Sequence, residues 1–428
     1  MNTVNTGNGL KVRAHIGDAM TLLAFDLAES KSQNFNGFTI RVTAGTRAPY
    51  YMTNLLKYPA AILKKNNIKS ADAGSTLYAA IQKYRWVHVP ATFHQIQSVF
   101  YGTYKYDVTP RYLVDDVLQP LDSDRTVTVS IDVSPFQSGK FQIGFTRGFV
   151  ASQAYVNHFG NNSKVRPNKT DLIFDIHSKS GSVRITKNGQ KPARITPSKI
   201  SMRGWGGRRG REFWSFWTKL SPIRISCRMP LHLIWTSLLS ATGAHTGQAG
   251  ALFAIMQYSS ASSILDAVKF VRDSNENIFS YGITDTTTSI SLYKPHSKLG
   301  ILVAGKGGAK ILPPPIDKEP AIPGIAIHHK FVVVDFKGRN PVVYCGSSNL
   351  AFGPEQKNGD NLIEIRNLAA VTVFAIEAIR LVDHFSFIEN THQIFLQTSG
   401  AATPWYASYY DPEALHFIDR TLMISANK

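Results

Sequence analysis

Alternation of apolar and polar residues is the strongest structural signal in the first 150 residues. It runs through Gly37 to Val42, Thr126 to Val133 and Lys140 to Phe145. A period of two is typical of a β-strand with one buried face, because successive side chains point to opposite sides of a sheet. We expect the aromatic residues of this region to form core and cross-strand pairs rather than a ligand platform. The pattern predicts a β-rich, sandwich-like accessory domain over residues 1–163.

From residue 250 onward, strand candidates alternate with helical periodicity. Ser260 to Arg272 repeats apolar residues at helical spacing, and Val371 to Ile388 is a long, largely apolar helix candidate. The strand candidates are Asn277–Thr284, Ser289–Tyr293, Leu299–Val303, Ile327–Phe336, Val342–Cys345 and Asn361–Ile365. Interleaved strands and helices are typical of α/β layers. We therefore predict an α/β fold over residues 250–395, a mixed sheet flanked by helices, followed by a C-terminal tail at 396–428.

The positive charge is concentrated in one segment. The chain has 47 Lys and Arg against 29 Asp and Glu, a net charge of +18, and residues 164–228 hold 16 basic and 3 acidic residues. Gly204 to Trp217 combines arginine with aromatics, which suits phosphate pairing and base stacking or an anionic membrane surface. We expect nucleic-acid or peripheral membrane contact through 164–228, with a solvated basic face as the alternative. Residues 164–249 are interpreted as a connector or a degenerate first half of the following domain.

The remaining composition excludes several classes of protein. The chain is 43% hydrophobic, which excludes a disordered or collagen-like protein. Cys227 and Cys345 form neither a disulfide framework nor a zinc-type spacing. The N-terminus lacks the basic start and apolar core of a signal peptide, and Met229 to Ala244 is too short and polar to be a good membrane span. We expect a cytoplasmic protein, with a membrane-peripheral one as the alternative.

One group of polar residues carries a chemical signature. His328, Lys330 and Asp335 form H-x-K-x4-D, and Gly346-Ser347-Ser348-Asn349 follows as G-S-x-N. On a strand, His328 and Lys330 point to the same face, His329 points the other way, and Asp335 lies near the strand end, facing away from the histidine side. A hairpin then returns Ser347 and Asn349 beside the first strand, and both can donate to phosphate oxygens.

This signature resembles the active-site motif of the phospholipase D superfamily over about residues 250–390. The resemblance implies hydrolysis of a phosphodiester through a phosphohistidine, with a second histidine as acid and base and with no metal or cofactor. It assigns His328 as nucleophile or acid/base, Lys330 as phosphate clamp, Ser347 and Asn349 as phosphate ligands, and Asp335 as an orienting, electrostatic group.

A second complete motif is missing from the sequence. His177 and Lys179 have the H-x-K spacing, but Arg184 stands where the aspartate belongs, so they form at most a degenerate second motif. Two copies of His328 could meet in a homodimer, or the first half could be degenerate. We therefore expect a phospholipase D-like phosphodiesterase acting on a phospholipid head group. The alternatives are a metal-independent endonuclease of the same superfamily and a non-catalytic phosphate or nucleic-acid binder.

Overall fold

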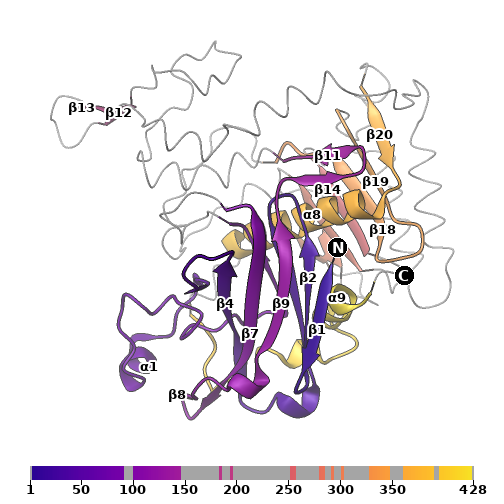
Figure 1. Ribbon diagram of the computed structural model, residues 1–428. Helices are drawn as coiled ribbons and strands as arrows, with labels where there is room; N and C mark the ends of the chain where they lie inside the picture. The colour runs from indigo at the N-terminus through magenta and orange to yellow at the C-terminus, as the bar shows by residue number, and fades with distance from the viewer. Residues whose placement is uncertain are drawn as a thin grey trace.

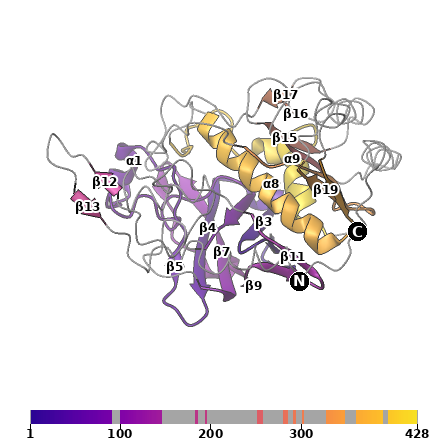
Figure 2. The ribbon, with the colours of Figure 1, turned by 90° about the horizontal axis from the view of Figure 1, so that it is seen from above.

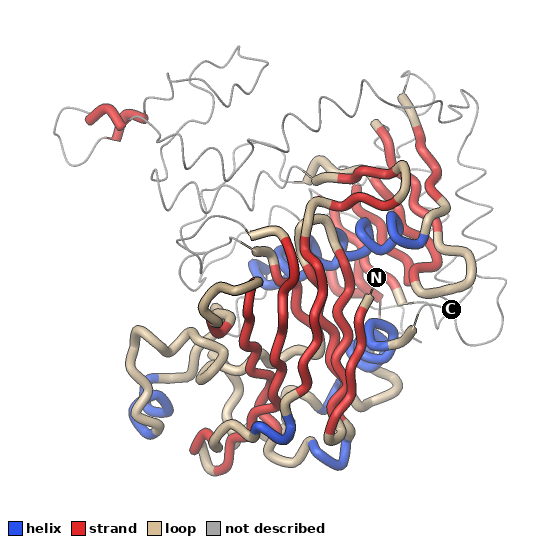
Figure 3. The backbone as a smooth tube through the Cα atoms, viewed as in Figure 1, coloured by secondary structure: helices blue, strands red, loops and turns tan. Residues whose placement is uncertain are grey.

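The computed structural model describes two long N-terminal segments, several isolated strands and a C-terminal part of the chain. The described residues are 2–90, 100–145, 183–185, 193–195, 251–256, 279–284, 291–293, 300–302, 327–347, 360–389 and 395–426. Strands dominate this part of the chain, and few helices accompany them (Figure 3).

Two antiparallel sheets form the N-terminal region. The first has the order β1-β2-β3-β6, with β1 at Thr3–Gly7, β2 at Leu10–Ile16, β3 at Thr21–Leu27 and β6 at Arg85–His88. The second has the order β5-β4-β7-β8, with β9 also paired to β7; its strands are β4 at Phe35–Ala44, β5 at Tyr50–Tyr51, β7 at Gly102–Val114, β8 at Val117–Leu118 and β9 at Val127–Val133. Figure 1 shows the long strands β2, β4, β7 and β9 standing side by side.

The alternation predicted for this region places its apolar side chains in one core. Val127, Val129, Ile131 and Val133 of β9 are all buried, whereas Ser130 and Asp132 between them are exposed. The same cluster contains side chains from both sheets, including Phe25 of β3. The predicted strands at 37–42 and 126–133 are confirmed by β4 and β9.

A third sheet is built from the second half of the chain. Its order is β17-β16-β15-β14-β18-β19-β20. The strands are β14 at Ala251–Met256, β15 at Ser280–Thr284, β16 at Ser291–Tyr293, β17 at Gly300–Leu302, β18 at Phe331–Phe336, β19 at Val342–Gly346 and β20 at Leu362–Ile365. Only the β14–β15 pair is parallel among these described strands.

The α/β prediction for the fold class was wrong. The described residues are 40% strand and 19% helix, and antiparallel sheets predominate instead of an α/β sheet flanked by helices. One physical reason is the shortness of connections such as the turn at 337–341 between β18 and β19, since a parallel pair needs a crossover of a dozen or more residues. The helix expected at Ser260 to Arg272 lies outside the described residues.

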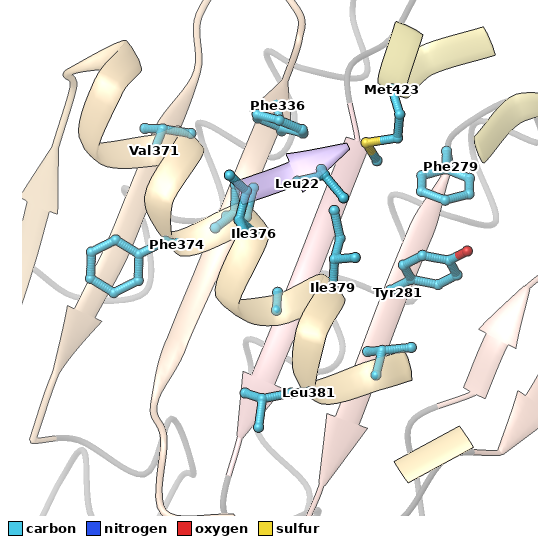
Figure 4. Packing of buried hydrophobic residues seen from close by; sticks show 14 of the residues in the cluster. Leu22, Phe279, Tyr281, Phe336, Val371, Phe374, Ile376, Ile379, Leu381 and Met423 are labelled. Atoms are coloured by element: carbon cyan, nitrogen blue, oxygen red, sulfur yellow. The ribbon is translucent and has the colours of Figure 1, made fainter. Parts of the chain in front are cut away.

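A long helix, α8 (Leu368–Glu389), lies between the N-terminal sheets and the third sheet (Figures 1 and 2). Its residues 370–382 are buried all round, as expected for a helix with protein on every side. Figure 4 shows Ile376 and Ile379 of α8 beside Leu22 of β3 and near Tyr281 of β15. The predicted helix at 371–388 is confirmed within a few residues at each end.

Strand β3 is shared between two cores. Leu23, Phe25 and Leu27 face the N-terminal sandwich, whereas Leu22 and Ala24 pack in the cluster that contains α8. Both faces of the first sheet are therefore buried along β3. This strand joins the N-terminal sheets to the α8 layer through a continuous hydrophobic interior.

The segment predicted as a C-terminal tail, 396–428, ends in the helix α9 (Leu415–Ile424), which packs in the same core as α8. The end of α9 receives hydrogen bonds from three side chains of the preceding layers: Arg13 Nε to the Ile424 carbonyl (2.8 Å), His15 Nε2 to the Met423 carbonyl (2.8 Å) and Lys337 Nζ to the Ser425 carbonyl (3.0 Å). Cationic groups are favourable at this end of a helix, where carbonyls lack intrahelical partners.

An ion-pair network also ties α9 to the other layers. Arg85 of β6 pairs with Asp383 of α8 and with Asp419 of α9, whose Oδ2 lies 2.6 Å from Arg85 Nε. The Tyr281 hydroxyl donates to the same Asp419 oxygen at 3.0 Å. Arg85, Asp419 and Tyr281 are buried, so this network crosslinks four elements in the interior.

The remaining elements are short. They are α1 (Ala60–Lys65), the hairpins β10 (Phe136–Ser138) with β11 (Phe141–Ile143) and β12 (Val183–Ile185) with β13 (Ala193–Ile195), and the 3-10 turns at Glu29–Lys31, Ser123–Arg125 and Ala407–Tyr409. Apart from β12 and β13, the predicted connector at 164–249 lies outside the described residues. In the part of the chain that the structure describes, no helix combines the length and apolarity needed to cross a membrane.

Candidate active site

His328 and Lys330 lie together on the stretch that leads into β18. The strand begins at Phe331 rather than at the predicted Ile327, yet the two side chains meet. Lys330 Nζ lies 3.2 Å from Nδ1 and 3.4 Å from Nε2 of His328, and it donates to the His328 carbonyl at 3.0 Å. His328 is exposed and Lys330 is half-buried, so an external substrate has access to the pair. The two side chains therefore lie together, but on the segment that precedes the strand and not on a strand face.

The charge on Lys330 is influenced by its surroundings. Partial burial lowers the pKa of Lys330 from its ordinary value, and the carboxylate of Asp360 opposes that change. An anion arriving at Lys330 would also favour the charged form, since an opposite charge compensates the lost hydration. Because Lys330 is partly buried, its attraction to an oxyanion is less weakened by water than it would be at a fully exposed position.

Ser347 stands at the end of β19 in a closely bonded turn. Its hydroxyl donates to Asp360 Oδ1 and accepts from the Asn361 backbone N–H, both at 3.0 Å. Its own backbone N–H donates to Asn361 Oδ1 at 2.8 Å. Gly346 permits this approach, because a Cβ there would lie 2.2 Å from the Asn361 carbonyl oxygen. Asp360 therefore links Ser347 to the electrostatic surroundings of Lys330.

Asp335 lies at the other end of β18 from Lys330. Its Oδ2 accepts from the Asn340 backbone N–H at 2.8 Å, and its carbonyl accepts from the Gly338 N–H at 2.8 Å. Asp335 is buried and has a φ of 59°. It lies where the pairing of β18 with β14 is irregular, and Phe336 after it packs in the same core cluster as Phe331. An irregularity of this kind shifts the alternation by one residue. These contacts hold the hairpin turn, and an orienting role at the histidine stays a prediction.

His329 lies on the side of α8. Its Nε2 lies 4.0 Å from Oε1 of Glu377, and its ring packs edge-on against Phe331. Glu377 is fully buried and pairs with Arg380 one turn later, where the Arg380 Nε to Glu377 Oε2 distance is 3.1 Å. The sequence did not predict that Glu377 and Arg380 lie near His329, because both residues belong to a largely apolar helix sequence.

The structure brings together only part of the predicted site. Asn349, His177 and Lys179 lie outside the described residues. Asp360 and Asn361 were missed as site residues, although an Asp-Asn pair at the start of a strand candidate was visible in the sequence. Within the described ranges, no group of three or more His, Cys, Asp or Glu side chains could hold a metal ion.

Comparisons with known proteins add no further assignment. No family model matches the sequence, and no curated protein is significantly similar to it.

Proposed function

We propose that this protein is a phospholipase D-like phosphodiesterase in which His328 forms a covalent phosphoenzyme. The observation that carries the proposal is the exposed His328 imidazole with the Lys330 ammonium 3.2 Å away. A nucleophile beside a cation is what attack on an anionic phosphodiester requires, because the cation stabilises the charge on the phosphoryl oxygens.

The proposed reaction has two steps. In the first, an imidazole nitrogen of His328 attacks phosphorus, an N–P bond forms, and the leaving alcohol departs with a proton from a general acid. In the second, water attacks phosphorus, gives up a proton to the same group, and the N–P bond breaks. Lys330 holds the phosphoryl oxygens, and the Ser347 hydroxyl joins it by turning from Asp360 toward the bound substrate. The general acid is a second histidine, which we assign to a second copy of this chain in a homodimer.

The proposed substrate class is a phospholipid head group. The support is the resemblance at His328 to Asn349 and the concentration of positive charge in residues 164–228. Residues 251–395 carry equal numbers of acidic and basic residues, so the basic segment would hold the polyanion while Lys330 binds the reacting phosphate. The same charge also suits nucleic acid, which makes an endonuclease the competing outcome of the test.

The decisive experiment measures hydrolysis of an aryl phosphodiester in the presence of EDTA. His328→Ala should abolish the rate, and Lys330→Met should lower kcat about 10²–10³-fold, because one preorganised charge at a reacting oxyanion is typically worth that much. His416→Ala, which removes an exposed histidine from α9, should leave the rate unchanged. Equal rates in wild-type protein and His328→Ala would exclude the mechanism.

Further measurements separate the alternatives. Intact-mass analysis at neutral pH after a single turnover should show one added phosphoryl group in wild-type protein and none in His328→Ala. Choline release from phosphatidylcholine vesicles, compared with nicking of plasmid DNA, decides between lipase and endonuclease. Light scattering tests the homodimer. Binding of phosphodiesters without any turnover would favour a non-catalytic binder.

A further inference from the structure

Arg111 differs from the other buried arginines of the structure. Four arginines are less than a tenth exposed in the described part of the chain, and three of them have a carboxylate partner: Arg85 with Asp383 and Asp419, Arg380 with Glu377, and Arg420 with Asp26. Arg111 is only 4% exposed, yet its Nε and Nη1 have no hydrogen-bond partner among the residues that the structure describes. Buried charges in proteins are normally paired, so this guanidinium lacks the expected counter-charge.

The position of Arg111 explains why it is buried. It lies on β7, where Tyr104, Tyr106 and Val108 face the sandwich core, so by alternation it belongs to the outer face with the exposed Lys105. The segment between β5 and β6 covers this end of the outer face (Figure 1). Its Tyr58 and Ile62 pack with Leu113, the next outward residue of β7.

The strand beside Arg111 is irregular, and Ile81 and Ala80 pack directly against its backbone. The partner of Arg111 across the sheet is Gly37, which has no side chain, a φ of 127° and an irregular register. Irregularities of this kind frequently lie beside functional sites, where they change the direction of side chains.

The groups around Arg111 do not neutralise it. The titratable side chains that influence it are Tyr58, Tyr51 and Tyr78. Burial raises the pKa of Tyr58 to about 12, so this phenol is neutral at physiological pH. The Tyr58 oxygen accepts a hydrogen bond from Asn36, which leaves its own O–H to donate elsewhere. Tyr51 and Tyr78 are half-buried and give the region a partly wet rim.

We propose that Arg111 anchors a second ligand site, in which the carboxylate or phosphate group of a small molecule supplies the counter-charge. The guanidinium matches such oxyanions through several N–H groups, and the Tyr58 hydroxyl adds a donor. The site uses none of the residues of the candidate active site, so its test is independent of the proposed phosphodiesterase activity.

The experiment measures binding of inorganic phosphate and of acetate by calorimetry and by thermal shift, at constant ionic strength set with chloride. Wild-type protein should show saturable stabilisation by at least one of the two ions. Arg111→Met should weaken that binding about tenfold to a hundredfold, the usual loss for hydrogen bonds to a charged group. Arg111→Lys should bind with intermediate affinity. Tyr58→Phe, which keeps the ring and removes the hydroxyl, should bind more weakly than wild type.

Arg41→Met is the matched control. Arg41 lies on the same outer face, is 44% exposed at its side chain and faces Asp107 at 3.7 Å, so its loss removes an equal charge while the Arg111 guanidinium and the Tyr58 hydroxyl stay in place. It should keep the wild-type response. The proposal is overturned if neither ion stabilises the wild-type protein, or if folded Arg111→Met and Arg111→Lys both respond as wild type does. The phosphate and acetate arms also identify which oxyanion the site prefers.

Discussion

His15 provides a direct test of how the α9 junction is stabilised. Its side chain is completely buried on β2, with Nε2 2.8 Å from the Met423 carbonyl. Burial lowers the pKa of His15 to about 3, and the nearby charges of Lys337 and Arg13 act in the same direction. The imidazole is therefore neutral in the native protein at every pH at which the protein is handled, and it donates its ring N–H to the end of α9.

The sign and size of the pH dependence follow from this pKa. Between pH 6.5 and about 3, the unfolded chain binds a proton at His15 that the native protein does not bind, so native stability falls as the pH falls. Each pH unit within that window is worth about 1.4 kcal/mol, and the full window corresponds to about 4–5 kcal/mol. This is a large part of the ~5–15 kcal/mol that stabilises a typical domain.

The informative variant is His15→Gln, which keeps an N–H donor and removes the titration. Urea unfolding between pH 7 and pH 4 should show the wild-type free energy of unfolding falling more steeply than that of the variant, by about 1.4 kcal/mol per unit below pH 6. His416→Gln is the control, because this exposed ring contacts Ser408 and Tyr409 and takes no part in the junction at the end of α9. Parallel pH profiles for wild type and His15→Gln would refute the reasoning.

Two other structural features make equally direct predictions. Arg85→Met should destabilise the protein by about 3–5 kcal/mol in urea unfolding, because it leaves two carboxylates without their buried partner; a loss below about 1 kcal/mol would contradict the network. Gly346→Ala should lower phosphodiesterase activity, because its Cβ would collide with the Asn361 carbonyl and separate Ser347 from Asn361. Gly400→Ala, where a Cβ meets no atom within 4 Å, should leave activity unchanged.

Local patterns in the sequence predicted individual elements well. Alternation identifies β9 because every second residue faces one core, and the long apolar run at 371–388 identifies α8. The layer arrangement was not predictable in the same way. Thr21–Leu27 buries both faces, and the segments that cover them come from β4 to β9 on one side and from α8 and α9 on the other. No local window contains that information.

The candidate site shows the same division. The proximity of His328 and Lys330 was predicted, although the two residues lie just before β18 and not on it. Asp360 approaches them only because β20 pairs with β19, which places residues far apart in sequence side by side. Glu377 was hidden because a charged residue within a largely apolar helix has no periodic signature. Long-range pairing and isolated buried charges thus account for what the sequence did not reveal.

The double burial of β3 has a consequence for synthesis of the protein. The core cluster on the α8 side of β3 also contains residues of α9. The contact between Met423 of α9 and His15 of β2 joins residues that are 408 positions apart in the sequence. At a ribosomal rate of about 5–20 residues per second, the early strands wait about 20–80 s before that helix exists. Until α8 and α9 have been made, the outward face of β3 with Leu22 and Ala24 lacks the helices that cover it. Newly made protein is therefore most vulnerable to aggregation and most dependent on chaperones before α8 and α9 have been synthesised.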